Sequence, residues 1–314
     1  MSNKFPRNEI YVYTSKTPLG EGKVFALNDR KIELTPSFKE YSERKWETKN
    51  KGWTSSIIPS AIEVSVNKDS MEVHCGLTEY KYLLGMVKLI TETKNTDSAP
   101  AIHGLSTEIM PLTLDGIFLL GRREKSTTRH GIGFYDIPNA GQNAQMWLDK
   151  IPIEQSHLVE GLFDMVGFPK WNMMRNACLN ENEIGEIFYT GFSRGFEVSL
   201  DSQFNGYAPV RLSADELKNR KGNENKLFYH FYDLAEVLDS INKNSRLKED
   251  IYGNTPEPTE NGFKIIDDCL GTLLSNTKHI RGEKEYNQGL EVLENRGYEI
   301  KDISQGNIQL NSLV

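Results

Sequence analysis

Apolar and polar residues alternate along several short stretches of the chain, as they do in half-buried β-strands. The stretches EIYVY (9–13), AIEVSV (61–66) and MEVHCGL (71–77) follow this pattern, and the turn NKDS joins the last two into a predicted hairpin. A second hairpin is predicted within 109–124, where Asp115-Gly116 separates two apolar runs. Further strands are expected within 130–138, 183–203 and 226–234.

Other stretches repeat their apolar residues every three or four positions, which is typical of amphipathic helices. Helices are predicted over 35–52 and 77–93, and over 152–168, where Pro152 stands at the expected start and Gly167 at the expected end. A short capped helix is expected from Ser213, and two late helices are expected at 261–278 and before Gly297.

The composition is that of an ordinary globular protein. The chain has 314 residues, of which 38% are hydrophobic and 26% charged, so it is long enough for one large core or two modest ones. We divide it into an N-terminal β-rich strand-helix module (1–98), a central domain (99–278) and a helix-strand extension (279–314), with the polar stretch 94–100 as linker.

The charge and the cysteine content indicate which kind of partner and which cellular compartment to expect. A net charge of -7 argues against a nucleic-acid binder, because phosphate backbones favour clustered Lys and Arg, and it leaves a small molecule as the expected partner. Cys75, Cys178 and Cys269 have neither disulfide nor zinc spacing. No signal peptide and no apolar segment of about 20 residues is visible, so we expect a cytoplasmic protein without membrane contact.

The order of these elements resembles the Nudix superfamily. In that family the elements follow one another in the same order. A hairpin ends in Arg122-Arg123, and after it come a strand, the turn PNAGQ (138–142), a helix that ends in glycine and an aromatic residue, and further strands. Residues 46–48 (WET), 76–80 (GLTEY) and 83–85 (LLG) look closest to the branch that hydrolyses UDP-sugars. The resemblance covers about residues 46–275 and implies a Nudix-type α/β/α sandwich with a mixed sheet, and a homodimer.

The motif of that family, G-x5-E-x7-R-E-U-x-E-E-x-G-U with U apolar, is largely lost. When DMVGF (164–168) is aligned on E-E-x-G-U, Asp164 and Met165 stand at the two acidic positions. Glu160 then replaces the arginine and Gly161 the first glutamate of the helix. Because Mg²⁺ needs oxygen ligands, we expect metal-dependent hydrolysis to be weak or absent.

The resemblance nevertheless implies a set of site residues. If Mg²⁺ is held at all, its ligands and the catalytic acids are Glu160 and Asp164, which would share one helix face at i,i+4; the alternative is a solvated acidic face. The expected ligand is a nucleoside-diphosphate compound such as a nucleotide-sugar. The residues expected to bind it are Arg122, Arg123, His130, Asn139, Gly141 and Arg194.

Several alternatives remain open at this point. Glu291 and Glu294 in GLEVLENRGYEI (289–300) imitate the lost motif, although a helix ended by glycine and followed by a strand explains them equally well. One of Glu181, Glu183 and Glu186 could replace a lost metal ligand, whereas His74, His157 and His230 are expected to be core histidines. In function, the protein is a weak hydrolase, a ligand-sensing or partner-binding module, or a metal-free biosynthetic enzyme.

Overall fold

The computed structural model describes residues 9–49, 55–95, 99–123, 135–137, 161–195, 201–220, 225–231, 233–242, 249–254, 267–302 and 306–310. Helices and two mixed β-sheets make up these residues, so the predicted α/β class is confirmed in its general form. No helix among them is long and apolar enough to cross a bilayer.

The large sheet has the strand order β11-β6-β5-β10-β9-β1-β12, with β7 beside β6. Two of its pairs, β1 with β12 and β5 with β10, are parallel, and the remaining pairs are antiparallel. Its strands are β1 (Glu9–Leu19), β5 (Leu105–Leu112), β6 (Ile117–Arg123), β7 (Tyr135–Asp136), β9 (Phe188–Gly195), β10 (Ser202–Pro209), β11 (Asn225–Phe231) and β12 (Glu299–Asp302).

The small sheet has the order β13-β3-β4-β2-β8. Its centre is the predicted hairpin of 61–66 and 71–77, which the structure confirms as an antiparallel pair closed by a bond from the Asn67 amide to the Ser70 carbonyl (2.9 Å). The strands are β2 (Val24–Asn28), β3 (Ile57–Val66), β4 (Met71–Glu79), β8 (Gly161–Leu162) and β13 (Gly306–Gln309).

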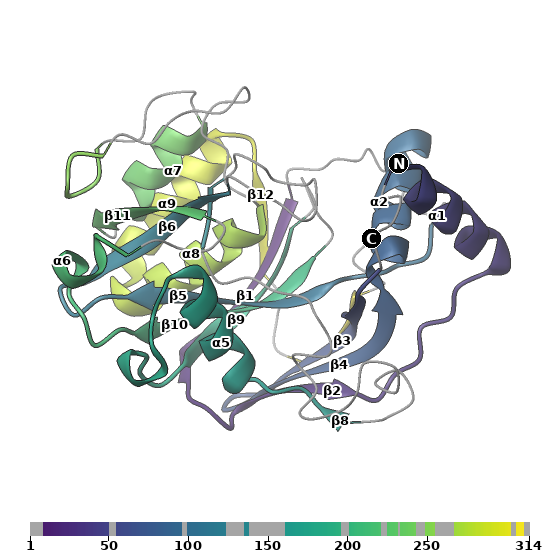
Figure 1. Ribbon diagram of the computed structural model, residues 1–314, viewed down its shortest axis with the longest axis horizontal. Helices are drawn as coiled ribbons and strands as arrows, with labels where there is room; N and C mark the ends of the chain where they lie inside the picture. Colours follow the sequence, from purple (N-terminus) through teal and green to yellow (C-terminus); the bar gives the residue numbers. More distant parts are fainter. Residues whose placement is uncertain are drawn as a thin grey trace.

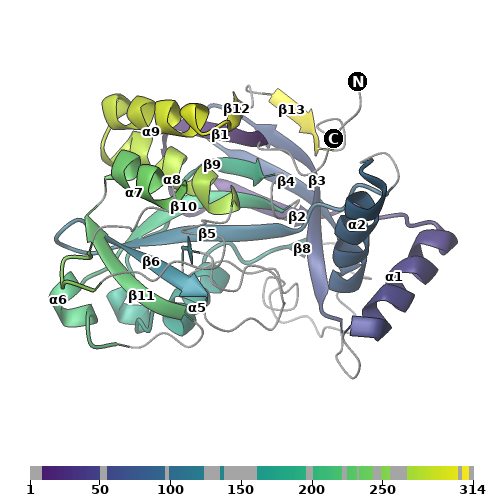
Figure 2. The ribbon, with the colours of Figure 1, turned by 90° about the horizontal axis from the view of Figure 1, so that it is seen from above.

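The helices lie at the two ends of the long axis and beside the sheets (Figure 1). At one end α7 (Leu234–Asn242), α8 (Asp267–Ile280) and α9 (Glu283–Asn295) pack together, and α8 covers β1, β9 and β10. At the other end α1 (Pro36–Lys49) packs on α2 (Tyr80–Thr93), as Figure 2 also shows. The shorter helices are α5 (Gly167–Asn176), the 3-10 turn η2 (Glu181–Glu183) and α6 (Ala214–Leu217), whose Ser213 caps it as predicted.

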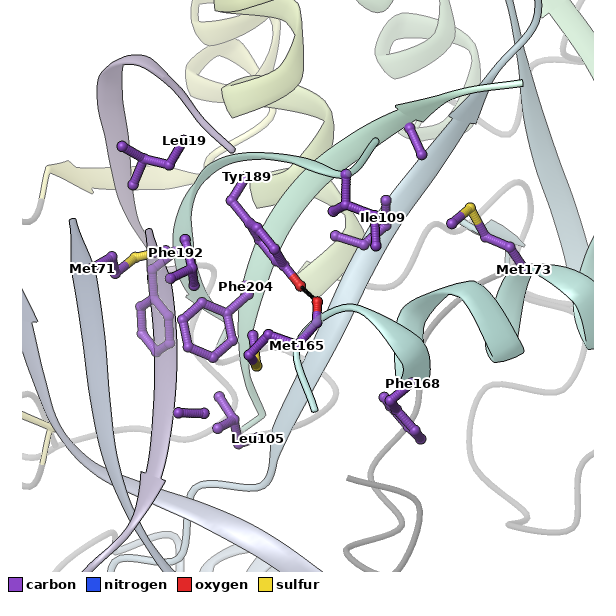
Figure 3. Close-up of a cluster of buried hydrophobic side chains, with 14 of the residues drawn as sticks. Leu19, Met71, Leu105, Ile109, Met165, Phe168, Met173, Tyr189, Phe192 and Phe204 are labelled. Atoms are coloured by element: carbon purple, nitrogen blue, oxygen red, sulfur yellow. Dashed lines mark hydrogen bonds between the residues drawn. The ribbon is translucent and has the colours of Figure 1, made fainter. Parts of the chain in front are cut away.

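A shared hydrophobic core joins the two sheets. Val64 and Val73 of the small sheet, Phe192 and Phe204 of the large sheet and Phe168 of α5 belong to one buried cluster (Figure 3). The Phe204 ring meets the Phe192 ring edge-on, with centroids 5.8 Å apart. A second cluster lies between the opposite face of the large sheet and helices α7–α9. The large sheet is therefore buried on both faces.

Strand pairing crosses the domain boundaries that we predicted from the sequence. β1 lies within 1–98 but pairs with β9, which lies within 99–278. β12 and β13, both within 279–314, pair with β1 and β3 respectively. The C-terminal segment thus adds one strand to each sheet, and the three-part division stays a prediction.

The ladder between β5 and β6 opens soon after the turn that joins them. The predicted Asp115-Gly116 turn is confirmed, with Gly116 at φ 74°, and Leu112 pairs with Phe118 next to it. Farther along β6, Gly121 and Arg122 pair with β7, while β11 pairs with the other edge of β6 over its whole length. β7 therefore takes the place of β5 beside the end of β6.

Candidate functional site

Asp164 lies in the turn between β8 and α5. Its Oδ1 accepts hydrogen bonds from the backbone amides of Val166 (3.0 Å) and Gly167 (2.7 Å). These are amides at the start of a helix, which have no partner inside the helix, and an Asp side chain is a preferred cap for them. The carboxylate that we expected to bind metal therefore caps α5.

The predicted helix over 152–168 is wrong in the part that the structure describes. Gly161 and Leu162 form a strand that pairs with Asn28 and Leu27 of β2. Gly167 begins α5 instead of ending a helix. The apolar spacing of this segment fits the predicted helix as well as the observed strand and turn. The residues that indicate a helix start at Gly167 are the capping Asp and Pro169, because proline is favoured in a first helical turn.

The proposed pairing of Glu160 with Asp164 on one helix face is also wrong, because β8 lies between the two positions. Glu160 itself lies outside the described residues, as do His130, Asn139 and Gly141. Their roles stay predictions.

α5 follows the cap but carries no carboxylate along Gly167–Asn176. Its charged residues are Lys170, whose Nζ lies 3.2 Å from Glu21 Oε1, and Arg175, which lies over the Trp171 ring. Among the described residues no three His, Cys, Asp or Glu side chains are grouped so that they could hold a metal ion.

The Tyr189 side chain connects this turn to the large sheet. Its hydroxyl donates to the Met165 carbonyl (2.6 Å), as Figure 3 shows. Burial raises the pKa of Tyr189 well above its ordinary value, and the negative charges of Asp164 and Glu21 raise it further. Tyr189 therefore stays a neutral hydrogen-bond donor that fixes the turn.

The two arginines that end the predicted hairpin are the last two residues of β6. Arg122 is partly buried and pairs in register with Tyr135 of β7 and Lys226 of β11. Arg123 pairs with Asn225. Both arginines therefore lie where β7 replaces β5, directly before the segment that contains the predicted ligand turn.

Arg194 lies on β9 and is completely buried. Its Nη1 donates to the Leu310 carbonyl (2.8 Å), directly after β13. Tyr189 and Arg194 are five positions apart on the same strand, which at about 3.3 Å per residue places their backbones about 17 Å apart. The structure therefore does not bring Arg194 and the Asp164 turn together.

The acidic candidates near the C-terminus lie on the last helix, α9. Glu291 and Glu294 lie on α9, which is followed by Gly297 at φ 84° and by β12, so the helix-glycine-strand interpretation is confirmed. Glu291 also lines a cavity of about 750 Å³ between α7 and α9, together with Asp233, Glu236 and Asp239.

His74 is only partly buried and its Nδ1 lies 2.8 Å from Asp29 Oδ2, whereas the side chains of His157 and His230 lie outside the described residues.

Glu183 forms the best-defined ion pair of the acidic candidates. Both Arg220 guanidinium nitrogens donate to its carboxylate, and the Asn180 amide donates to Oε2 (2.7 Å). The hydrogen bond from Arg220, the largest cause, lowers the pKa of Glu183 to about 2. Glu183 thus fixes η2 against the loop after α6 and is not available as a metal ligand.

A pH-dependent loss of stability should follow from this pair. Because the pKa of Glu183 is lower in the folded protein than in the unfolded chain, the stabilisation is complete above about pH 5 and disappears as the pH falls toward 2. Glu183→Gln should lower the free energy of unfolding by about 1–2 kcal/mol at pH 7 and by less at pH 3, measured by urea denaturation. Exposed Glu181, changed to Gln, is the control; an equal loss in both variants at pH 7 would contradict the assignment.

A buried polar network under α8 was not predicted from the sequence. Gln203 Nε2 on β10 donates to Glu108 Oε2 on β5 (2.9 Å) and to Thr272 Oγ1 on α8 (3.0 Å). Asn205 Oδ1 accepts from Thr272 Oγ1 (2.8 Å) and from Ser193 Oγ (2.9 Å). The polar residues inside the apolar strands at 105–112 and 202–209 were the signal that could have indicated it.

Compared with models of known protein families and with characterised proteins, the chain matches none of them. The resemblance to the Nudix superfamily therefore stays an expectation from the residue patterns quoted above.

Proposed function

We propose that the protein is a Nudix-like module that binds a nucleoside-diphosphate compound, such as a nucleotide-sugar, without needing a divalent metal. The observation that carries the metal-free part is the use of Asp164 as the cap of α5, with Gly167 N 2.7 Å from its Oδ1. Because Oδ1 already accepts two amide protons, only Oδ2 is left as a ligand, and one protein oxygen is a weak basis for holding Mg²⁺. The adjoining helix supplies no other carboxylate.

The nucleotide part of the proposal is supported by the order of elements around Arg122. The β5-β6 hairpin, the paired arginines and β7 follow one another as the resemblance implies. Arginine is the side chain best suited to phosphate, because its guanidinium can donate two parallel hydrogen bonds. The sandwich arrangement of the family is part of the same proposal.

Calorimetric titration of the full chain with UDP-glucose and ADP-ribose, with Mg²⁺ and then with EDTA, tests this function. We expect the same Kd in both buffers and no release of nucleoside monophosphate. Asp164→Ala should lower the free energy of unfolding by about 1 kcal/mol through loss of the cap and leave the Kd unchanged.

Asp164→Asn is the matched control, because an amide oxygen can still accept the two backbone hydrogen bonds. It should retain most of the stability and all of the affinity. Mg²⁺-dependent turnover that both Asp164→Ala and Asp164→Asn abolish would instead establish the protein as a metal-dependent hydrolase.

A further inference from the structure

Arg122 ends a row of residues along one face of β6. Successive residues of a strand alternate between its two faces, so Phe118, Leu120 and Arg122 share one face and Arg123 is on the other. Phe118 and Leu120 are buried in the cluster beneath α7–α9, whereas Arg122 is only half-buried. The cover over this face of the sheet is therefore incomplete at the end of β6, and a ligand can reach Arg122 there.

The register of β11 places a second cation beside Arg122. β11 pairs with β6 in one continuous register, in which Lys226 is directly opposite Arg122. Figure 2 shows these two strands side by side. Directly opposite residues of an antiparallel pair are on the same face, with Cβ atoms about 5 Å apart. Arg122 and Lys226 are therefore neighbours, whereas Arg123 is opposite Asn225 on the other face.

The strand on the other edge of β6 brings no acidic residue to this row. Tyr135 of β7 is directly opposite Arg122. Asp136, the acidic residue of β7, is opposite Gly121 and is therefore on the same face as Arg123. The row across the three strands thus consists of a tyrosine, an arginine and a lysine.

Two cations at directly opposite positions destabilise a sheet, because their charges repel each other. An acidic or neutral residue at position 226 would be the more stable choice opposite Arg122. The net charge of the chain is -7, so a generally basic composition does not explain the pair. The arrangement becomes favourable when an anion is bound by both residues.

We propose that Arg122 and Lys226 together bind the diphosphate group of the ligand. This inference rests on the proposed function and adds to its site Lys226, a residue that the sequence patterns did not single out. A guanidinium can donate two parallel hydrogen bonds to phosphoryl oxygens, and a lysine ammonium adds a compact positive charge. Two such cations supply the charge neutralisation that Mg²⁺ supplies in metal-dependent sites, so the subsite needs no metal ion.

The test uses the full chain in EDTA, titrated calorimetrically with pyrophosphate, UDP-glucose and uridine. We expect Lys226→Ala to raise the Kd for pyrophosphate and for UDP-glucose about tenfold, the effect of one lost hydrogen bond to a charged group, and to leave uridine binding unchanged. Lys226→Glu should raise the first two Kd values about a hundredfold or more, because it sets a negative charge against the diphosphate.

Melting temperatures distinguish ligand binding from a structural role of Lys226. Without ligand, Lys226→Glu should melt at a higher temperature than the wild type, because an attractive cross-strand pair replaces a repulsive one. Lys31→Glu is the control, since it changes the net charge equally at a side chain that is 86% exposed; it should leave the Kd values unchanged. Weaker binding by Lys226→Glu together with a lower melting temperature would overturn the subsite, because Lys226 would then be needed for the fold.

The outcomes separate this inference from the proposed function. If the wild type binds UDP-glucose and both Lys226 variants bind it equally well, the subsite is wrong and the function stands. If pyrophosphate binds and depends on Lys226 but UDP-glucose does not bind, the subsite stands and the nucleotide function is wrong. Absence of binding to either probe overturns both.

Discussion

Gly271→Ala should lower the free energy of unfolding by about 3 kcal/mol, because α8 lies too close to the large sheet for a side chain at this position. A Cβ atom on Gly271 would lie 2.3 Å from both Cβ and Oγ of Ser193 on β9, in a region without exposed surface. The helix or the strand would have to shift, and the polar network that includes Ser193 and Asn205 would shift with it. At about 2 °C per kcal/mol for a chain of this size, the melting temperature should fall by about 6 °C.

Two further variants test whether the loss of stability in Gly271→Ala comes from the steric clash with Ser193. Ser193→Gly removes the atoms that the new methyl group would meet, so in a double-mutant cycle it should reduce the cost of Gly271→Ala. Gly289→Ala in α9 is the matched control, because its new Cβ meets the end of the flexible Leu234 side chain at 2.6 Å and alanine favours the helix. Equal losses in Gly271→Ala and Gly289→Ala would show that the approach of α8 to β9 is not the limiting contact.

Phe204→Ala should be at least as damaging, with an expected loss of about 4 kcal/mol. The side chain is completely buried at the centre of the shared core, where its ring meets Tyr189 at 6.0 Å and Phe192 at 5.8 Å, both edge-on. Alanine would remove this burial and both ring contacts and would leave a cavity between the two sheets. Urea denaturation should show a lower midpoint with an unchanged slope.

Phe204→Leu keeps most of the volume and should cost about 1–2 kcal/mol. Leu114→Ala is the control for truncation of an exposed apolar side chain. Leu114 is 71% exposed at the hairpin turn, so its truncation should change the free energy of unfolding little. A loss for Phe204→Ala as small as that for Leu114→Ala would mean that the two sheets do not depend on this core.

The sequence predicted the local structure well wherever a turn or cap residue marked an end. Asp115-Gly116, the capping box at Ser213 and Gly297 after α9 all lie where the turn chemistry placed them. Each is decided by a few neighbouring residues, which is why a single sequence contains the information.

The features that the sequence did not reveal depend on contacts between distant segments. The apolar spacing of 152–168 is compatible with a helix, but pairing of Leu162 with Leu27 of β2 selects a strand. The same limit applies to Arg122 and Lys226, because only the pairing of β6 with β11 makes them neighbours on one face of the sheet. Asp164 was singled out by aligning DMVGF on the Nudix motif, whereas its contacts with the following amides make it a cap.

The positions of β12 and β13 bear on how the chain folds during synthesis. β1, the first strand, is flanked by β9 and by β12, and β3 is flanked by β13, so neither sheet is complete until residues 299–309 have left the ribosome. Until then the long strands β1 and β3 are the edges of their sheets, whereas in the complete chain the short strands β12 and β13 take those places. Long unpaired edges promote aggregation more than short ones do. A chain that stops before residue 299 should therefore aggregate more readily than the full chain.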